Sequence, residues 1–264
     1  MLRFVFLGGN GHARARLVPA RRALSASGGS FELEEAVYPG FEDRPRSSSF
    51  DAFLDAVAAS VVDLARGQRT VLYATGIGAL FALCLRARGG PRVPLLMQGP
   101  VLWGLERRLT PRLSALGPAR RAIAVAFASH FFQTHFVRRN FVVEPPDDVR
   151  KGFFDGYARC SALVDFFAWL TPALLRDLER RFTDDPAALD RIAIWWGERD
   201  RIVTPKELAW TTQALHVSWP IRTFAGWGHY PMIDDARRWV EWLPEGADEA
   251  ERAIATPVAP AHIP

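Results

Sequence analysis

The chain has 264 residues, and its 33 basic and 29 acidic side chains give a formal net charge of +4. Apolar residues make up 49% and charged residues 23%, a composition typical of a soluble globular protein that excludes long disorder, collagen and coiled coil. At this length we expect one large domain, or a core with a small insertion.

Short apolar runs alternate with longer helical patterns in the first part of the chain. The runs predict buried strands at 2–7, 31–38, 70–74 and 93–98. The patterns between them predict helices at 12–26, 50–66 and 76–88. Buried strands that are joined by helices predict a parallel sheet with right-handed crossovers.

The pattern then changes, because residues 101–186 are rich in aromatics and prolines and contain no clear strand. Strand patterns resume at 192–196 and 221–224, with helices that begin near 205 and 234, the last of which ends near 242. We therefore expect an α/β core made of 1–100 and 187–246, a helical cap at 101–186, and a flexible C-terminal tail at 247–264.

Nucleic-acid and metal partners are not indicated. The arginines are spread along the chain between acidic residues and are interpreted as solvated helix faces, whereas a nucleic-acid groove needs a basic cluster with exposed aromatics. Cys84 and Cys160 lie far apart and form no metal or disulfide pattern. His130 and His135 point in different directions on a helix, so we expect no metal site.

The apolar runs also bear on the cellular compartment. The first run, residues 4–7, is shorter than the apolar region of a signal peptide, which needs about 7–15 residues. No run reaches the roughly 20 apolar residues of a membrane span. We expect a soluble, cytoplasmic protein without a membrane span, and the sequence does not indicate its oligomeric state.

Three places in the chain carry motifs, and each follows a predicted strand, where doubly wound sheets place their sites. Residues 8–11, Gly-Gly-Asn-Gly, follow the first strand. Residues 74–78, Ala-Thr-Gly-Ile-Gly, form a tight strand-to-helix turn. Residues 197–205 and 226–231 follow the last two strands, and they contain the acid and the histidine discussed below.

In these motifs the chain resembles the α/β-hydrolase superfamily, and in particular its cap-bearing lipase, esterase and C–C hydrolase members. The resemblance extends from residue 2 to about residue 244. It implies a mostly parallel sheet of about six strands, flanked by helices and covered by a helical cap insertion. The chain begins at the strand that leads to the family's oxyanion loop, so the resemblance implies that the family's first two strands are absent.

The resemblance also implies roles for individual residues. Asp200 matches the acid and His229 matches the base of the family's catalytic triad. Gly9, Asn10 and Ile77 match the positions whose backbone amides form the oxyanion hole. The alternative for His229 is a capped-loop histidine, and the alternatives for Asp200 are a cap of the helix that begins near Pro205 or an ion pair with Arg199 or Arg201.

The strand-to-helix turn departs from the family pattern. Alignment of residues 74–78 with Gly-x-Ser-x-Gly puts Gly76 at the position of the nucleophilic serine. Glycine has no side chain to form an acyl-enzyme, although it easily adopts the positive φ of such a turn. Thr75 is interpreted as a strand-end hydroxyl rather than as a displaced nucleophile. We therefore interpret Gly76 as a degenerate nucleophile position.

Three more residues are candidates for the substrate pocket. Gln98 ends the fourth predicted strand, where its amide is placed to donate to a substrate carbonyl. His12 either faces the pocket or lies in the first turn of a helix. Trp103 belongs to the aromatics of the expected cap, most of which are assigned to the core and some to the pocket roof. No dinucleotide motif or P-loop is present, so no cofactor is predicted.

Two functions remain open. One is an enzyme that acts on a small, largely apolar ester or carbonyl substrate through His229 and Asp200 and an oxyanion pocket, without a serine nucleophile. Non-covalent hydrolysis, a lyase step and cofactor-free oxygenation all fit this arrangement. The other is a non-catalytic ligand-binding or scaffold protein, which the missing serine favours. The retained histidine and acid favour the enzyme.

Overall fold

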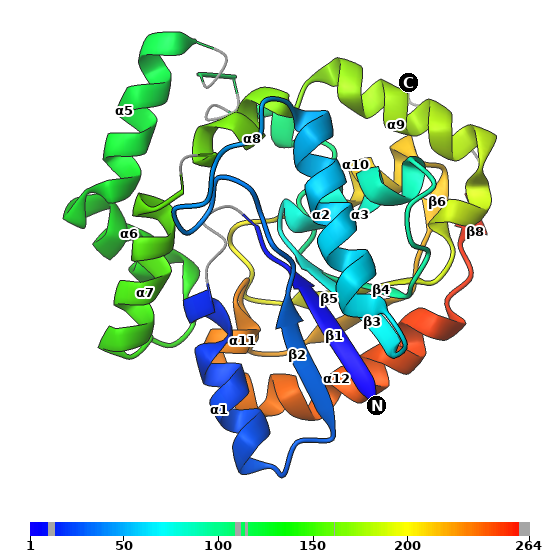
Figure 1. The fold of residues 1–264 in the computed structure, drawn as a ribbon, viewed down its shortest axis with the longest axis horizontal. Coiled ribbons are helices and arrows are strands. Elements are labelled where there is room, and N and C mark those ends of the chain that lie inside the picture. The colour runs from blue at the N-terminus through cyan, green and yellow to red at the C-terminus, as the bar shows by residue number, and fades with distance from the viewer. Residues whose placement is uncertain (10–13, 109–111, 114–115, 161, 259–264) are drawn as a thin grey trace.

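The computed structural model describes residues 1–9, 14–108, 112–113, 116–160 and 162–258. Six parallel strands form the central sheet in the spatial order β2-β1-β3-β4-β5-β7 (Figure 1). The strands are β1 (Leu2–Leu7), β2 (Phe31–Glu35), β3 (Arg69–Thr75), β4 (Leu95–Gln98), β5 (Ile192–Gly197) and β7 (Ile221–Phe224). The predicted parallel sheet of about six strands is confirmed.

Helices cover both faces of this sheet. A 3₁₀ turn, η1 (Arg14–Leu17), leads into α1 (Val18–Ala26), which packs with α12 (Ala236–Arg252) on one face. Helices α2 (Phe50–Ala65) and α3 (Gly78–Ala87) pack on the other face. Helix α2 begins where it does because the hydroxyl of Ser49 accepts a hydrogen bond from the Ala52 amide at 3.1 Å. Helix α10 (Pro205–Ala214) begins at a capping box between Thr204 and Glu207.

The segment between β4 and β5 is helical, and its described residues contain no strand. Its elements are η2 (Leu105–Arg107), α5 (Gly117–Ala128), α6 (His130–Asn140), α7 (Asp147–Ala158), α8 (Leu163–Trp169), α9 (Pro172–Asp184) and η3 (Pro186–Leu189). Helices α5, α6 and α7 lie beyond the carboxyl ends of the strands, whereas α9 packs against α3 (Figure 1). No helix in the described part of the chain is both long and apolar enough to cross a lipid bilayer.

The C-terminal region differs from the prediction that the last helix ends near residue 242 and that a flexible tail begins at 247. Helix α12 continues to Arg252, and β8 (Thr256–Pro257) pairs with β6 (Val217–Ser218) in a separate antiparallel sheet. The helix continues because its small residues face the sheet: a Cβ at Gly246 would lie 2.3 Å from the Trp195 ring. The helix side chains that are buried include Leu243, Ala247 and Ala250.

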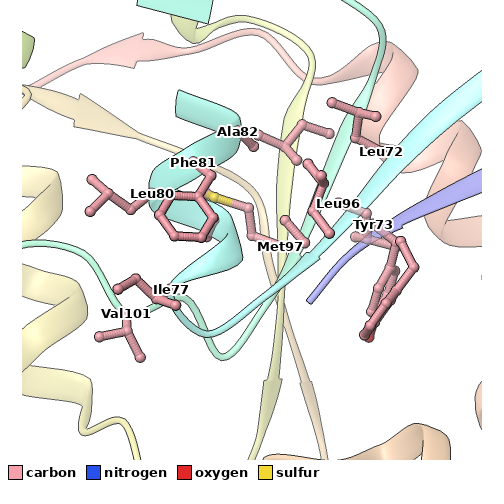
Figure 2. Packing of buried hydrophobic residues seen from close by; sticks show 14 of the residues in the cluster. Leu72, Tyr73, Ile77, Leu80, Phe81, Ala82, Leu96, Met97 and Val101 are labelled. Atoms are coloured by element: carbon pink, nitrogen blue, oxygen red, sulfur yellow. The ribbon is translucent and has the colours of Figure 1, made fainter. Parts of the chain in front are cut away.

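The hydrophobic core lies on both faces of the sheet, because successive side chains of a strand point to opposite faces. Met97 points toward Phe81 of α3, whereas Tyr73 lies on the opposite side of the sheet (Figure 2). On that side the Tyr73 hydroxyl accepts a hydrogen bond from Nε1 of Trp239 in α12 at 2.8 Å and donates to Oε1 of Gln98 at 3.4 Å. Strands β3 and β4 therefore contribute side chains to the packing of α3 on one face of the sheet and of α12 on the other.

Candidate functional site

A buried histidine and a buried aspartate meet at the carboxyl ends of the last two strands. His229 follows β7 and precedes the short helix α11 (Pro231–Asp234), and Asp200 follows β5. Nδ1 of His229 lies 2.8 Å from Oδ2 of Asp200. Their side chains are 5% and 0% exposed, respectively. The pair is thus shielded from bulk water, and an electrostatic contact is stronger in the protein interior than in water.

The loop after β5 holds the carboxylate of Asp200 in place. Its Oδ1 accepts hydrogen bonds from the amides of Ile202 at 2.8 Å and Val203 at 3.0 Å. Burial raises the pKa of Asp200, but the charge and hydrogen bond of His229 and these two amides outweigh it, so the pKa lies below its ordinary value. Because an ionised carboxylate only accepts hydrogen bonds, Nδ1 of His229 donates to it, and in the neutral imidazole Nε2 is then the acceptor.

Nε2 of His229 faces the turn between β3 and α3. A Cβ added to Gly76 would lie 3.3 Å from Nε2. Gly76 has a φ of +53°, a left-handed conformation that glycine adopts without steric cost. Its carbonyl accepts hydrogen bonds from the amides of Ala79 at 3.2 Å and Val101 at 3.0 Å, so the turn is held from both sides.

The loop after β1 lies against the same turn. A Cβ at Gly9 would be 3.2 Å from the Thr75 carbonyl oxygen and 3.6 Å from the Ile77 amide nitrogen. Ile77 is the N-cap of α3, and the first amides of a helix have no acceptor within that helix. Such amides favour negative charge. Asn10 and His12, which the sequence analysis placed at this loop, lie outside the described residues.

The backbone at Gly99 lies directly against the hydrogen bond between Asp200 and His229, and this residue was missed in the sequence analysis. Its φ is +48°, and a Cβ there would lie 2.5 Å from Oδ2 of Asp200 and 2.9 Å from Nδ1 of His229. The backbone after β4 can therefore approach the hydrogen bond of the pair only without a side chain. The signal was a glycine followed by Pro100 at the end of a buried strand.

A cavity of ≈ 150 Å³ opens next to His229 and is lined by Gly9, Gly76 and Ile77. Its other walls combine aromatic, aliphatic and polar side chains, and α5, α6, α7 and α8 each contribute one ring to them. These rings are Phe127, Phe136, Tyr157 and Phe167. The helical segment between β4 and β5 thus forms one wall of a cavity that the strand ends complete.

The sequence model of the Alpha/beta hydrolase family matches residues 4–242. The chain belongs to the α/β-hydrolase family. This match covers the sheet from within β1 onward, the turn at Gly76 and the loops of Asp200 and His229. No curated protein sequence matches the chain at a significant level.

Solved structures of the α/β-hydrolase fold resemble the chain over almost its full length. An esterase from Exiguobacterium antarcticum is 13% identical with a TM-score of 0.67, and the match covers 94% of this chain and 92% of that one. A bromoperoxidase from Bacillus anthracis is 17% identical with a TM-score of 0.65, with coverages of 94% and 92%. A thermophilic esterase from Thermogutta terrifontis is 15% identical with a TM-score of 0.60, with coverages of 95% and 91%. At these identities the likeness shows the fold.

Two residues that were predicted for the pocket of this α/β-hydrolase-family chain lie elsewhere. Gln98 has the same strand parity as Leu96, so its fully buried side chain points to the α12 face and meets Tyr73 rather than the cavity. Trp103 donates from its indole Nε1 to Glu179 of α9 at 2.6 Å and does not line the cavity. Alternation along β4 explains the position of Gln98, and the hydrogen bond to Glu179 explains that of Trp103.

Four polar residues that line the cavity were missed, namely Arg16, Arg108, Tyr157 and Tyr230. Arg16 is 2% exposed and lines the cavity beside Tyr157 and Tyr230. The interpretation of the arginines as solvated helix faces is therefore wrong for Arg16, and also for Arg86, which is 1% exposed and donates to backbone carbonyls. The spacing of arginines carries no signal for burial, because it does not show which face of a short turn meets the fold.

Asp234 joins the helical segment to the histidine loop. Its Oδ1 accepts from the amides of Val142 at 3.1 Å and Val143 at 3.4 Å. Burial raises the pKa of Asp234 to about 7, although these amides and the charge of His229 lower it. A raised pKa means that the folded state binds the proton more tightly than the unfolded state, so stability falls as the pH rises through about 7.

We expect this loss of stability to be visible in urea unfolding. Between about pH 5 and about pH 8 the free energy of unfolding of the wild type should fall. Glu35, whose pKa burial also raises to about 7, contributes in the same direction, so Asp234→Asn provides the comparison. The variant retains an oxygen for the two amides and should gain stability relative to the wild type at the higher pH. If the difference in the free energy of unfolding between Asp234→Asn and the wild type were the same at both pH values, the raised pKa of Asp234 would be contradicted.

Proposed function

We propose that the protein is an enzyme in which His229, oriented by Asp200, acts as a general base on a small, largely apolar ester or carbonyl substrate. The observation that carries the proposal is the direction of the imidazole. Its Nδ1 is bound to the carboxylate at 2.8 Å, while its Nε2 lies 3.3 Å from the place where a side chain on Gly76 would begin. A base held in this way directs Nε2 at a molecule bound in the cavity, from which it can accept a proton.

Gly76 is proposed to occupy the position of the family's nucleophilic serine. Without a hydroxyl at this position, an acyl-enzyme cannot form by the usual route. In the reaction that we favour, His229 removes a proton from water as the water oxygen attacks the carbonyl carbon of an ester. The protonated imidazole then returns the proton to the departing alkoxide, so that an ester and water become an acid and an alcohol.

The amides of Gly9 and Ile77 are proposed to hold the negative charge that develops on the carbonyl oxygen. This role is supported by the position of Ile77 at the start of α3 and by the closeness of Gly9, since a Cβ added to Gly9 would lie 3.6 Å from the Ile77 amide nitrogen. Amides at such a position bind an oxyanion without rearrangement during the reaction. The same base and the same amides also serve a lyase step or a cofactor-free oxygenation.

The size and walls of the cavity support a small, largely apolar substrate. Its volume of ≈ 150 Å³ is close to that of apolar protein cavities that take up one benzene ring, and its aromatic rings come from four helices. We propose that residues 101–186 act as a cap, because this segment supplies those rings. The cap then sets which acyl or aryl groups reach His229.

A second candidate function, a non-catalytic ligand-binding protein, is favoured by one observation. Gly76 removes the group that most hydrolases of this fold use for attack, and the cavity remains lined for an apolar ligand. A binding protein, however, does not require an oriented imidazole. The two functions differ in whether turnover of a bound ester depends on His229.

We expect His229→Gln to lower kcat/KM for phenyl acetate and 4-nitrophenyl acetate by about 10²–10⁴-fold, because a general base contributes about that much. Asp200→Asn should also lower kcat, since it no longer fixes the imidazole tautomer. The matched control is His216→Asn, an exposed histidine outside the cavity at a φ of +50°, which asparagine tolerates. Rates equal to the wild type in His229→Gln would contradict the enzyme proposal, and ligand binding without turnover in all variants would favour the binding protein.

A further inference from the structure

A tyrosine of the helical segment brings a neutral hydrogen-bonding group to the cavity wall. Tyr157 belongs to α7, is 5% exposed and lines the cavity that contains Gly76 and His229. Its ring stacks on that of Phe127 at a centroid distance of 5.3 Å and lies 5.5 Å from that of Phe153. These ring contacts fix the position of the Tyr157 hydroxyl before a ligand binds.

The hydroxyl of Tyr157 is an acceptor for its protein neighbours. Nη2 of Arg16 donates to it at 3.5 Å, and a hydrogen bond joins it to the hydroxyl of Tyr230. Burial raises the pKa of both tyrosines, so both keep their protons at neutral pH. The hydrogen bond between them lowers the pKa of Tyr157 and raises the pKa of Tyr230, because Tyr230 donates and Tyr157 accepts.

The proton of Tyr157 is therefore left for a molecule in the cavity, since the described part of the chain contains no hydrogen bond in which this hydroxyl donates. Arg16 acts here only through Tyr157, because its charge lowers the pKa of the phenol against the effect of burial and makes it a stronger donor. Arg108, another polar residue of the cavity, is engaged by the carboxylate of Glu207 through two hydrogen bonds of 2.7 Å.

We propose that the hydroxyl of Tyr157 donates a hydrogen bond to a neutral oxygen of the bound molecule. One phenol proton matches one lone pair of a ketone, ester or ether oxygen, whereas a buried carboxylate or phosphate needs several donors or an opposite charge. The substrate class is thus a small, largely apolar ester with a second, neutral acceptor oxygen apart from the reacting carbonyl. That the molecule is an ester rests on the proposed function, whereas the hydrogen bond from Tyr157 does not.

Binding to the full chain is tested by calorimetry with acetophenone and α-methylstyrene, in which a CH₂ group replaces the carbonyl oxygen. The readout is the ratio of the two dissociation constants. Tyr157→Phe should reduce the preference for acetophenone about 10-fold, the effect of one buried hydrogen bond. The matched control is Tyr73→Phe, which removes a buried hydroxyl that contacts Trp239 and Gln98 outside the cavity and should leave the ratio unchanged.

Tyr230→Phe tests the order of the two hydroxyls. Tyr157 keeps its proton in this variant, so the preference for acetophenone should fall less than in Tyr157→Phe. A larger fall in Tyr230→Phe would overturn the assignment of the donor to Tyr157. An equal ratio in Tyr157→Phe and the wild type would also overturn the proposal. Tyr157-dependent binding of benzoate that is tighter than that of acetophenone would overturn it too, since the site would then take an anion.

Infrared difference spectroscopy on the wild type keeps the proposal testable if Tyr157→Phe does not fold. The carbonyl stretch of bound acetophenone should lie at a lower frequency than in hexane, because a hydrogen bond to the oxygen weakens the C=O bond. A stretch at the hexane frequency would overturn the proposal.

Kinetics with 2-methoxyethyl acetate and butyl acetate, which differ by an ether oxygen in place of CH₂, separate this inference from the proposed function. In Tyr157→Phe, KM for 2-methoxyethyl acetate should rise about 10-fold, whereas KM for butyl acetate should not change. A preference for acetophenone that depends on Tyr157, with no hydrolysis of either ester, would overturn the proposed hydrolysis and leave the hydrogen bond standing. Hydrolysis of both esters with KM values that Tyr157→Phe changes equally would overturn the hydrogen bond and leave the hydrolysis standing.

Discussion

Gly76→Ser should make the protein reactive toward serine-directed reagents, and the wild type should not react with them. The new Cβ would lie 3.3 Å from Nε2 of His229, so its hydroxyl can reach hydrogen-bonding distance of a base that Asp200 already orients. The substitution places a side chain at a φ of +53°, which costs about 1–2 kcal/mol. Intact-mass spectrometry should show one fluorophosphonate adduct per chain, and 4-nitrophenyl acetate should give a burst of acylation.

Two controls isolate the hydroxyl and the base. Gly76→Ala carries the same backbone strain without a nucleophile, and should not be labelled. The double variant Gly76→Ser/His229→Gln retains the hydroxyl without the base, and its labelling rate should fall by about 10²–10⁴-fold. A folded Gly76→Ser protein without an adduct would show that the cavity is not arranged for acyl transfer, which favours the ligand-binding alternative. An adduct on the wild type at Thr75 would contradict the role assigned to that residue.

The sheet was predictable because its strands leave a pattern that needs no knowledge of tertiary contacts. Both faces of a parallel strand are buried, so runs such as 4–7 and 192–196 are apolar without alternation. The loops of Asp200 and His229 were also found from sequence, through the family resemblance, because each follows a predicted strand and contains glycines near the polar residue. Their 2.8 Å contact depends on the sheet order, which brings β5 and β7 together.

The lining of the cavity was not predictable in the same way. Gln98 was assigned from its place at a strand end and Trp103 as one of the aromatics of the expected cap, but alternation on β4 and a contact with α9 direct these side chains elsewhere. Arg16 is buried because η1 packs under α7, which brings together residues that are far apart in the sequence. The continuation of α12 to Arg252 likewise depends on how closely Gly246 approaches Trp195. These outcomes are set by packing between elements, which a single sequence does not encode locally.

The backbone at Gly99, directly after β4, lies against the carboxylate of Asp200 and the imidazole of His229. A side chain at this position should therefore have the second large effect, on both turnover and stability. Gly99→Ala combines a φ of +48° with a Cβ that would lie 2.5 Å from Oδ2 of Asp200, a distance that real Cβ atoms do not adopt. The carboxylate must move, and the imidazole of His229 loses the contact that orients it. We expect kcat/KM to fall by about 10²-fold or more, and the free energy of unfolding to fall by several kcal/mol.

The matched control is Gly226→Ala, at a φ of +85° and with no atom within 4 Å of the new Cβ. It carries backbone strain alone, about 1–2 kcal/mol, and should leave turnover unchanged. A double-mutant cycle then assigns the excess cost of Gly99→Ala to the carboxylate. In an Asp200→Ala background the clash with Oδ2 is removed and the approach to Nδ1 of His229 at 2.9 Å remains, so the cost of Gly99→Ala should shrink toward that of Gly226→Ala. An equal cost of Gly99→Ala in both backgrounds would show that the backbone at residue 99 does not set the position of Asp200.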